Sequence, residues 1–343
     1  MSDIALNPKQ LATLLEKTIA ARHPVLIQGA PGIGKTDIVT QAAAAAGADL
    51  LIIYSTCSDP TDAKGMPATW YDKETGHQEA DFIPFAYLKQ MITTKKPLVV
   101  FLDDVGGAPP AVQLSQMNLV HARKTGDGTP ISDNVVFIAA TNRRQDRAGV
   151  TGMLEPFKSR WTTIVELQAD VEAWTPWALA NNLPTEIIAF IRFRPELLHD
   201  FKPSADLNNT PSPRTVANVG KLMQIGLPPE MEYSVFSGAA GEGFTAEFMG
   251  FLRICRQLPN PDVILMNPDK AEVPTDPATL YALCGALSRK ASAGNIERLV
   301  TYSNRLPAEF SVMTMRDVFV QKPDLQSTRA AITWFTAHQG VML

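Results

Sequence analysis

The sequence has few cysteines and no long apolar run, and these absences exclude several classes of protein. Cys57, Cys255 and Cys284 are odd in number, widely separated and without a C-x-x-C spacing, so we expect neither a disulfide framework nor a structural zinc site. No segment approaches the roughly 18 consecutive apolar residues of a membrane-spanning helix, and residues 1–10 contain no apolar signal segment. We therefore expect a cytoplasmic protein that does not bind a membrane.

The sequence also lacks a strong excess of charge of either sign. Lys and Arg number 31 against 35 Asp and Glu, which gives a net charge of -4, so no overall field attracts nucleic acid. The five histidines do not have the spacing of metal ligands. We therefore expect that they do not form a metal site. With 343 residues, 45% of them hydrophobic, the chain is long enough for two or three domains with a sizeable core.

What the sequence does contain is a complete phosphate-binding motif. Residues 29–36 read G-A-P-G-I-G-K-T and directly follow an apolar run at residues 25–27. Glycines are needed because the turn must bring several backbone N–H groups to one point, in front of the following helix. Lys35 then supplies a cation to the β and γ phosphates, and Thr36 a hydroxyl to Mg²⁺. The predicted ATP-binding residues are Gly29, Ala30, Pro31, Gly32, Ile33, Gly34, Lys35, Thr36 and Asp37.

Further apolar runs predict a parallel sheet that is covered on both faces. They lie at residues 50–54, 98–102, 135–139 and 162–167, and near-continuous apolar strands are typical of such sheets. Asn7 and Pro8 predict the start of a helix before the first strand. Two insertions are expected to be hairpins, one from residues 66–71 and 77–82 and one at residues 123–131.

The first predicted hairpin contains two large aromatic residues. Alternation along a strand places Trp70 and Tyr71 on opposite faces, so at most one of them is expected in the core. Core packing is favoured for either residue taken singly. Whichever of the two aromatic residues is not in the core is a candidate contact for a partner protein.

After residue 168 the pattern changes to helices, starting with residues 171–180 and 185–193. A turn-rich connector at residues 206–213 leads into a helix at residues 214–224. Five prolines between residues 258 and 277 are expected to prevent regular structure, and the glycines of residues 238–243 indicate a flexible connector rather than a second nucleotide loop. We predict an α/β nucleotide-binding domain at residues 1–168, a helical lid at 169–226 and a helical C-terminal region at 227–343.

Two carboxylates end the third apolar run, in the form of a Walker B motif. Residues 97–104 read P-L-V-V-F-L-D-D, and a buried strand would deliver Asp103 to the sheet edge beside the P-loop. There Asp103 can hold Mg²⁺, while Asp104 can orient or deprotonate the attacking water. A solvated acidic turn is the alternative interpretation.

The next run ends in A-A-T-N-R at residues 139–143. A P-loop, a strand ending in Asp-Asp and a strand ending in Ala-Ala-Thr-Asn-Arg, in this order, resemble the AAA+ ATPases. The resemblance implies that Asn142 is the sensor that contacts the γ-phosphate or its attacking water. An asparagine that caps a turn is the alternative.

Two arginines would complete the AAA+ site. Residues 155–161 are similar to the segment that carries the arginine finger, which implies that Arg160 reaches the nucleotide of a neighbouring subunit. Arg143, Arg144 and Arg147 are alternatives for this role, and a solvated basic loop is another interpretation. Arg214 follows a predicted helix cap, where its charge costs about 0.3–1 kcal/mol unless an anion lies there. The resemblance implies a second sensor at this position; a merely tolerated, exposed arginine is the alternative.

The two insertions resemble the MoxR branch of the AAA+ ATPases, over about residues 1–225. This resemblance implies a ring or spiral of about six subunits that hydrolyses ATP at subunit interfaces. Its partner would be a protein client, such as a von Willebrand factor A domain protein, which it remodels as a chaperone does. The second acid of the Walker B strand departs from the family pattern, because Asp104 stands where glutamate is usual. The shorter side chain predicts slow hydrolysis with intact ATP binding.

Two other functions stay open. Related AAA+ branches include nucleic-acid motors and clamp loaders, although the net charge of -4 gives that function little support. The second is an ATP-gated structural assembly. In it hydrolysis is slow, and bound ATP mainly stabilises the contacts between subunits.

Overall fold

The computed structural model describes residues 5–71, 73, 74, 76–146, 152–203 and 207–338. The chain divides into two compact units, Met1–Gln168 and Ala169–Leu343, and each is described by itself. None of the described helices is both long and apolar enough to cross a bilayer. The predicted boundary between a lid and a C-terminal region at residue 226 stays a prediction.

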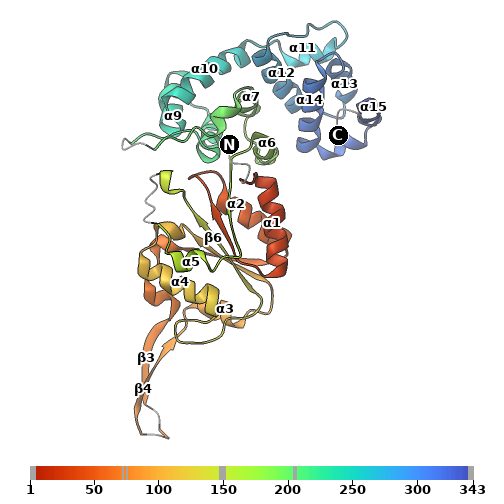
Figure 1. The fold of residues 1–343 in the computed structure, drawn as a ribbon. Coiled ribbons are helices and arrows are strands. Elements are labelled where there is room, and N and C mark those ends of the chain that lie inside the picture. Colours follow the sequence, from red (N-terminus) through yellow and green to blue (C-terminus); the bar gives the residue numbers. More distant parts are fainter. Residues whose placement is uncertain (1–4, 72, 75, 147–151, 204–206, 339–343) are drawn as a thin grey trace. The chain divides into compact units, whose positions relative to one another are not determined.

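The first unit contains a five-stranded parallel sheet (Figure 1). The strands lie in the order β2-β5-β6-β1-β7, so β1 is flanked by β6 and β7. This confirms the parallel sheet expected from the apolar runs. The strand bounds are β1 Val25–Gln28, β2 Asp49–Tyr54, β5 Leu98–Asp103, β6 Val135–Thr141 and β7 Thr163–Glu166.

Alternate residues of these strands enter two separate cores, because successive side chains of a strand point to opposite faces. Val99 and Phe101 of β5 pack on one face, whereas Leu98, Val100 and Leu102 pack on the other. Both faces are therefore buried, which explains why the strand reads as a continuous apolar run.

Helices cover both faces. The first core includes apolar residues of α1 (Pro8–Ala21) and α2 (Lys35–Ala45), and the second includes residues of α3 (Ala86–Thr93), α4 (Pro110–Ala122) and α5 (Glu155–Lys158). Asn7 caps α1 as predicted, and its side chain accepts a hydrogen bond from the backbone N–H of Gln10. Short 3-10 helices are η1 Ser55–Cys57, η2 Pro60–Ala63, η3 Val105–Gly107 and η4 Arg144–Asp146.

The first predicted hairpin is present and extends away from the sheet as a two-stranded ribbon (Figure 1). It consists of β3 (Met66–Tyr71) and β4 (Gln78–Ile83). Trp70 is 45% and Tyr71 65% exposed, so the expectation that core packing is favoured for either was wrong. Both faces of a protruding two-stranded ribbon meet solvent. The alternation of side chains between the two faces of the strand therefore does not bury either residue.

The second predicted hairpin is shorter than expected, since a single antiparallel bridge joins Lys124 to Pro130. The backbone N–H of Thr125 donates to the carbonyl of Thr129 at 2.9 Å. The Asp127 carboxylate accepts hydrogen bonds from both threonine hydroxyls. These bonds close a compact turn in place of a longer strand ladder.

The second unit is helical, with two connected cores. The cores meet at α12, whose Ala278 and Ala282 belong to one and whose Leu280 and Leu283 belong to the other. Its elements are α6 Val171–Ala180, α7 Thr185–Phe193, η5 Pro195–Leu198, α8 Pro213–Gln224, α9 Pro229–Ala240, α10 Glu242–Gln257, α11 Pro261–Met266, α12 Pro277–Lys290, α13 Ile296–Ser303, α14 Ala308–Gln321, η6 Pro323–Ser327 and α15 Arg329–Ala337.

One expectation about this unit was wrong, and another held only in part. Prolines do not prevent regular structure throughout residues 258–277, because Pro261 stands at the start of α11, where its missing N–H costs nothing. Residues 267–276 contain neither helix nor strand, as expected. The glycines of residues 238–243 do not form a flexible connector. Gly238 lies inside α9, and Gly241, with a φ of 91°, alone separates α9 from α10. A single left-handed glycine can turn the chain where a side chain would be strained.

Candidate functional site

The P-loop joins β1 to α2 at the carboxyl edge of the sheet. Gly34 precedes α2 with a φ of 94° and Gly32 has a φ of 75°, a left-handed conformation that favours glycine. A Cβ on Gly29 would lie 2.6 Å from the Ile33 side chain and 3.2 Å from the carbonyl oxygen of Leu167. The glycines of the motif are therefore needed for the shape of the loop. Asp37 is exposed in the first turn of α2, where the helix dipole favours an acid.

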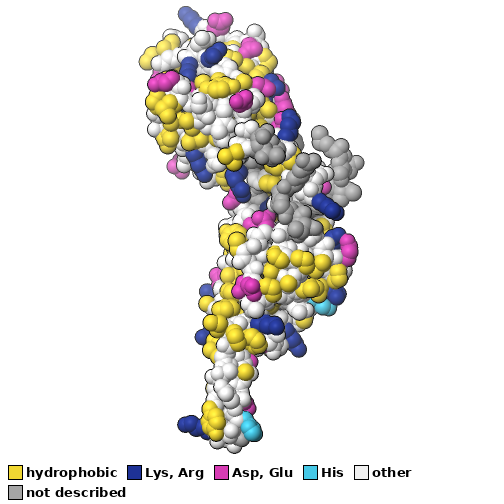
Figure 2. All heavy atoms as spheres, turned by 90° about the vertical axis from the view of Figure 1, so that its left-hand side faces the viewer, with side chains coloured by type: hydrophobic (Ala, Val, Ile, Leu, Met, Phe, Trp, Pro, Cys, Tyr) yellow, Lys and Arg dark blue, Asp and Glu magenta, His cyan; other side chains and the backbone are white. Residues whose placement is uncertain are grey.

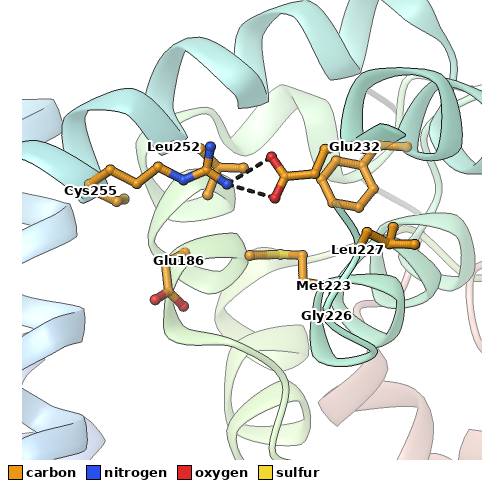
Figure 3. A pocket seen from close by; sticks show the side chains of 9 residues that line it. Glu186, Met223, Gly226, Leu227, Glu232, Leu252 and Cys255 are labelled. Atoms are coloured by element: carbon orange, nitrogen blue, oxygen red, sulfur yellow. Dashed lines mark hydrogen bonds and ion pairs between the residues drawn. The ribbon is translucent and has the colours of Figure 1, made fainter. Parts of the chain in front are cut away.

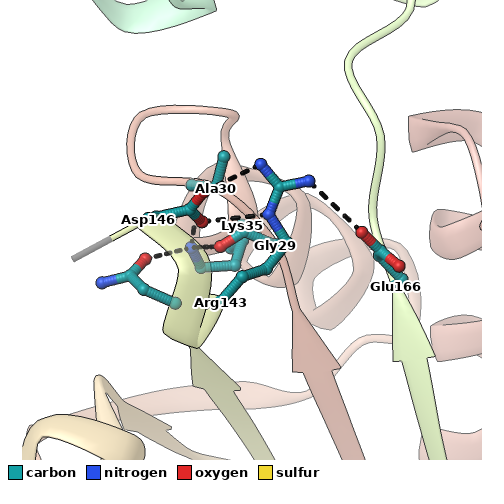
Figure 4. Close-up of polar contacts among 7 residues, drawn as sticks. Gly29, Ala30, Lys35, Arg143, Asp146 and Glu166 are labelled. Atoms are coloured by element: carbon teal, nitrogen blue, oxygen red, sulfur yellow. Dashed lines mark hydrogen bonds and ion pairs between the residues drawn. The ribbon is translucent and has the colours of Figure 1, made fainter. Parts of the chain in front are cut away.

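Lys35 is 7% exposed and lies inside this loop. Its Nζ donates to the carbonyl oxygens of Gly29 at 2.9 Å and Ala30 at 3.1 Å. A third bond, of 2.8 Å, reaches Oδ1 of Asn142 at the end of β6 (Figure 4). The structure thus brings the predicted phosphate-binding lysine and the predicted sensor together, although 107 positions separate them.

The two Walker B acids lie in the same cluster. Thr36 Oγ1 donates to Oδ2 of Asp103 at 3.1 Å, and Asn142 Nδ2 donates to Oδ1 of Asp104 at 3.0 Å. Burial, and then the neighbouring Asp104 carboxylate, raises the pKa of Asp103 above its ordinary value. The resulting cluster contains Lys35, Thr36, Asp103, Asp104 and Asn142.

Asp104 has a left-handed backbone, with φ 53° and ψ 39°. Asp and Asn adopt this conformation more readily than other residues with a side chain. The structure therefore gives a local reason for aspartate where the family pattern has glutamate.

Arg160 follows α5 and is half-buried. Among the described residues its Nε is buried without a hydrogen-bond partner. Of the three alternatives, Arg143 is engaged within the chain by Asp146 and Glu166, Arg144 is exposed, and Arg147 lies outside the described residues. Arg160 has no comparable ion pair within the described chain.

Arg214 belongs to the second unit, in the first turn of α8. The predicted cap is present, since the Ser212 hydroxyl accepts a bond from the backbone N–H of Thr215 and Pro213 is the first helical residue. Arg214 itself is exposed. Its role as a second sensor stays a prediction.

A comparison with protein families agrees with this geometry. Residues 24–161 match the model described as the AAA domain of the dynein-related subfamily. Residues 24–161 are an AAA domain. The match begins one residue before β1 and ends one residue after Arg160, so it contains the whole cluster. AAA domains are ATPase modules, whereas the narrower MoxR assignment stays a prediction.

Solved structures resemble the whole chain only weakly. RuvB of Thermotoga maritima, a Holliday junction branch migration motor, is 16% identical, with a TM-score of 0.40 over 82% of this chain and 80% of RuvB. NtrX from Brucella abortus, in complex with ADP, is 14% identical, with a TM-score of 0.43 over 91% of this chain and 68% of NtrX. A putative ATPase from Cytophaga hutchinsonii is 16% identical, with a TM-score of 0.36 over 79% and 92%. No curated protein matches the chain.

Sequence reasoning missed one ion-pair network of the first unit. Arg143 donates through Nε and Nη2 to both carboxylate oxygens of Asp146, at 3.0 and 2.9 Å, and through Nη1 to Oε1 of Glu166 at 3.4 Å (Figure 4). The hydrogen bond to Asp146 raises the pKa of Arg143. An Arg and an Asp three positions apart after a strand were the only sequence signal.

Outside the AAA domain, the helical unit has a pocket of about 250 Å³ (Figure 3). Arg256 donates to both oxygens of Glu232 at 2.7 Å across it, so these two charges balance each other. Burial raises the pKa of Cys255 to about 12, which keeps that thiol protonated at neutral pH. The lining residues are Glu186, Met223, Gly226, Leu227, Glu232, Phe236, Leu252, Cys255 and Arg256.

Proposed function

We propose that this chain binds and hydrolyses ATP at the cluster of Lys35, Thr36, Asp103, Asp104 and Asn142. The observation that carries the proposal is the hydrogen-bond chain from Lys35 through Asn142 to Asp104, which connects the P-loop to both strand ends. ATP would lie on the backbone N–H groups of residues 29–37, with Lys35 on its β and γ phosphates. Asp104 and Asn142 would orient the attacking water.

The residues present fit Mg²⁺. This ion prefers oxygen ligands and binds through one or two carboxylates together with substrate phosphates, and the Thr36 hydroxyl and Asp103 carboxylate lie side by side. Among the described residues, no group of three or more His, Cys, Asp or Glu side chains could hold a metal ion without such a substrate. A cation would also offset the repulsion between the Asp103 and Asp104 carboxylates. Bound Mg²⁺ would neutralise charge on the phosphates.

The direct test is ATP hydrolysis by the full chain with Mg²⁺, measured as phosphate release. The control is a titration with ATP and EDTA, since loss of Mg²⁺ should remove turnover. A well-folded chain that neither binds nor hydrolyses ATP would contradict the proposal.

We further propose that the chain acts as a MoxR-type ATPase, in a ring or spiral of about six subunits that remodels a protein partner. Arg160 would reach the nucleotide of the adjacent subunit, and Arg214 would act as the second sensor. The half-buried Arg160, with an Nε unpaired among the described residues, supports this role because a neighbouring subunit can supply its partner. A von Willebrand factor A domain is the proposed type of client.

Asp104→Asn is expected to lower turnover by about 10²–10⁴-fold while ATP affinity stays near that of wild type, because the amide cannot accept the proton of the attacking water. Asn tolerates the left-handed backbone, so the fold provides no reason for instability. Calorimetry with ATP and phosphate release measure the two effects. Equal loss of binding and turnover would contradict the assignment.

Asp104→Glu tests the slow-hydrolysis hypothesis. The extra methylene should bring the carboxylate closer to the attacking water and raise turnover, although the left-handed backbone costs glutamate roughly 1 kcal/mol of stability. Steady-state rates compared at matched ATP saturation decide between the two effects. A variant slower than wild type would show that the site is built for aspartate.

The β3–β4 ribbon is the proposed client contact. Hydrophobic side chains are exposed along it (Figure 2), and Met66 and Ile83, which face each other across the strands, are 60% and 59% exposed. Trp70→Ala and Tyr71→Ala should each change stability by less than about 0.5 kcal/mol, as is usual for surface positions. Client affinity should fall by about 30-fold, in proportion to a contact energy of about 2 kcal/mol.

The matched control for the ribbon is Tyr233→Ala, which removes an aromatic side chain, 44% exposed, from the helical unit. It should leave the affinity for the client unchanged. Candidate von Willebrand factor A domains provide the titrant. Client-stimulated turnover that both ribbon variants retain in full would exclude this contact.

A further inference from the structure

The residue directly after the predicted sensor makes more side-chain hydrogen bonds than the sensor itself. Asn142 makes side-chain bonds to Lys35 and Asp104, whereas Arg143 uses three guanidinium nitrogens on two carboxylates. The bidentate fork to Asp146 fixes direction as well as distance.

Asp146 is itself held by the main chain. Its backbone N–H donates to the carbonyl of Arg143 at 3.0 Å, which closes η4, and its side chain is 4% exposed. Main chain and side chain of Arg143 therefore both bind Asp146. These bonds fix the conformation of the turn after β6 at Arg143.

Glu166 connects the same guanidinium to the P-loop strand. Its backbone pairs with Gln28, the last residue of β1, and the N–H of Leu167 donates to the Gln28 carbonyl at 2.8 Å. Gly29 follows immediately. Arg143 thus joins the end of β6 to the strand pair that carries the P-loop.

We propose that Arg143 is a positioning residue for ATP hydrolysis: held by Asp146 and Glu166, it fixes the backbone at Asn142 and so keeps the Asn142 amide between Lys35 and Asp104. The inference rests on the proposed ATPase function. Arg143 does not touch the nucleotide in this role. Its loss should affect the alignment of water more than the binding of ATP.

Arg143→Ala should lower kcat by about 100-fold, the size of effect expected when a catalytic group is misplaced by about 1 Å. The KM for ATP and the Kd from calorimetry should stay within about threefold of wild type. Arg143→Lys keeps the charge but loses the fork, so its kcat should lie between the two. Phosphate release over an ATP titration, in the presence of Mg²⁺, separates kcat from KM.

Asp146→Asn provides a second route to the same broken contact if Arg143→Ala folds poorly. It keeps the size of the side chain and removes the charge that the guanidinium needs. If both variants act through one contact, the double variant Arg143→Ala/Asp146→Asn should be no slower than the slower single variant. A kcat loss that multiplies in the double variant would contradict a shared contact.

Arg123→Ala is the matched structural control. Arg123 is also half-buried and lies near the amino end of β6, where its Nη2 donates to the carbonyls of Ser132 and Val135 at 2.7 and 3.0 Å. Its loss should lower the melting temperature without lowering kcat per folded chain. An equal fall in kcat for Arg123→Ala would show that general weakening of β6 explains the effect.

The outcomes separate the two proposals. An active wild type whose kcat is unchanged within about twofold by Arg143→Ala would overturn the positioning role and leave the ATPase function standing. A folded wild type without ATP turnover would overturn the ATPase function and this inference with it.

Discussion

Lys35→Ala should abolish ATP binding. The variant removes the side-chain cation of the P-loop, and a charge-assisted hydrogen bond lost from a buried site costs about 1.5–3 kcal/mol, which is about a 10- to 150-fold loss of affinity for each contact. Lys35 is expected to contact both the β and the γ phosphate, so binding should fall below detection at micromolar ATP. Calorimetry with ATP and Mg²⁺ measures the effect.

Lys35 also holds the P-loop by its bonds to the carbonyls of Gly29 and Ala30, so the fold of the variant must be checked. Lys35→Met keeps most of the apolar stem and removes only the charge, and it should lose ATP binding to the same degree. The melting temperature of both variants without nucleotide shows whether the loop is disturbed. Unchanged affinity in a folded variant would disprove the phosphate-binding role.

Arg160→Ala should remove turnover and leave ATP binding nearly intact. An arginine supplied by a neighbouring subunit stabilises charge on the transferring phosphoryl group and is worth about 10³–10⁵ in rate. The nearby Lys158, paired with Glu155 at 2.6 Å on the surface, provides the matched control. Lys158→Ala removes a cation from the same turn and should keep wild-type turnover.

Mixing of subunits tests whether Arg160 acts in trans. Arg160→Ala subunits retain an intact P-loop, and Lys35→Ala subunits retain an intact Arg160, so mixed assemblies should recover part of the activity that each variant lacks alone. Sedimentation of differently labelled subunits verifies that the assemblies are mixed. If mixed assemblies stay inactive, the trans role is wrong.

Much of the first unit could be predicted because its signals are local. Strands that are buried on both faces must be apolar at every position, and the runs at residues 50–54 and 98–102 became β2 and β5 almost residue for residue. The P-loop motif and the Asn7 cap depend on backbone geometry within a few positions. The parallel order of the strands then brings their carboxyl ends to one edge, so that Lys35, Asp103 and Asn142 could be grouped in advance.

The wrong expectations concern burial and context, which are not local properties. Trp70 and Tyr71 are large aromatic residues of the kind that is usually buried in a core. The ribbon that carries them leaves the sheet, however, and both of its faces meet solvent. A proline interrupts a helix only when it lies in the interior of that helix. Pro261 is the first residue of α11, so it does not interrupt it. Local residue preferences limit which conformations a segment can adopt. Tertiary packing decides which of these conformations forms and which side chains are buried.

The sequence by itself determined the phosphate-binding loop, the parallel sheet and the group of residues at its carboxyl edge, because motif spacing and strand burial act over short stretches of chain. Only the tertiary structure decided that Arg143 is engaged by Asp146 and Glu166, and that Arg160 has an Nε unpaired among the described residues. Hydrogen-bond direction depends on where side chains from distant strands end. That arrangement is created by folding and is not encoded in the spacing of the residues.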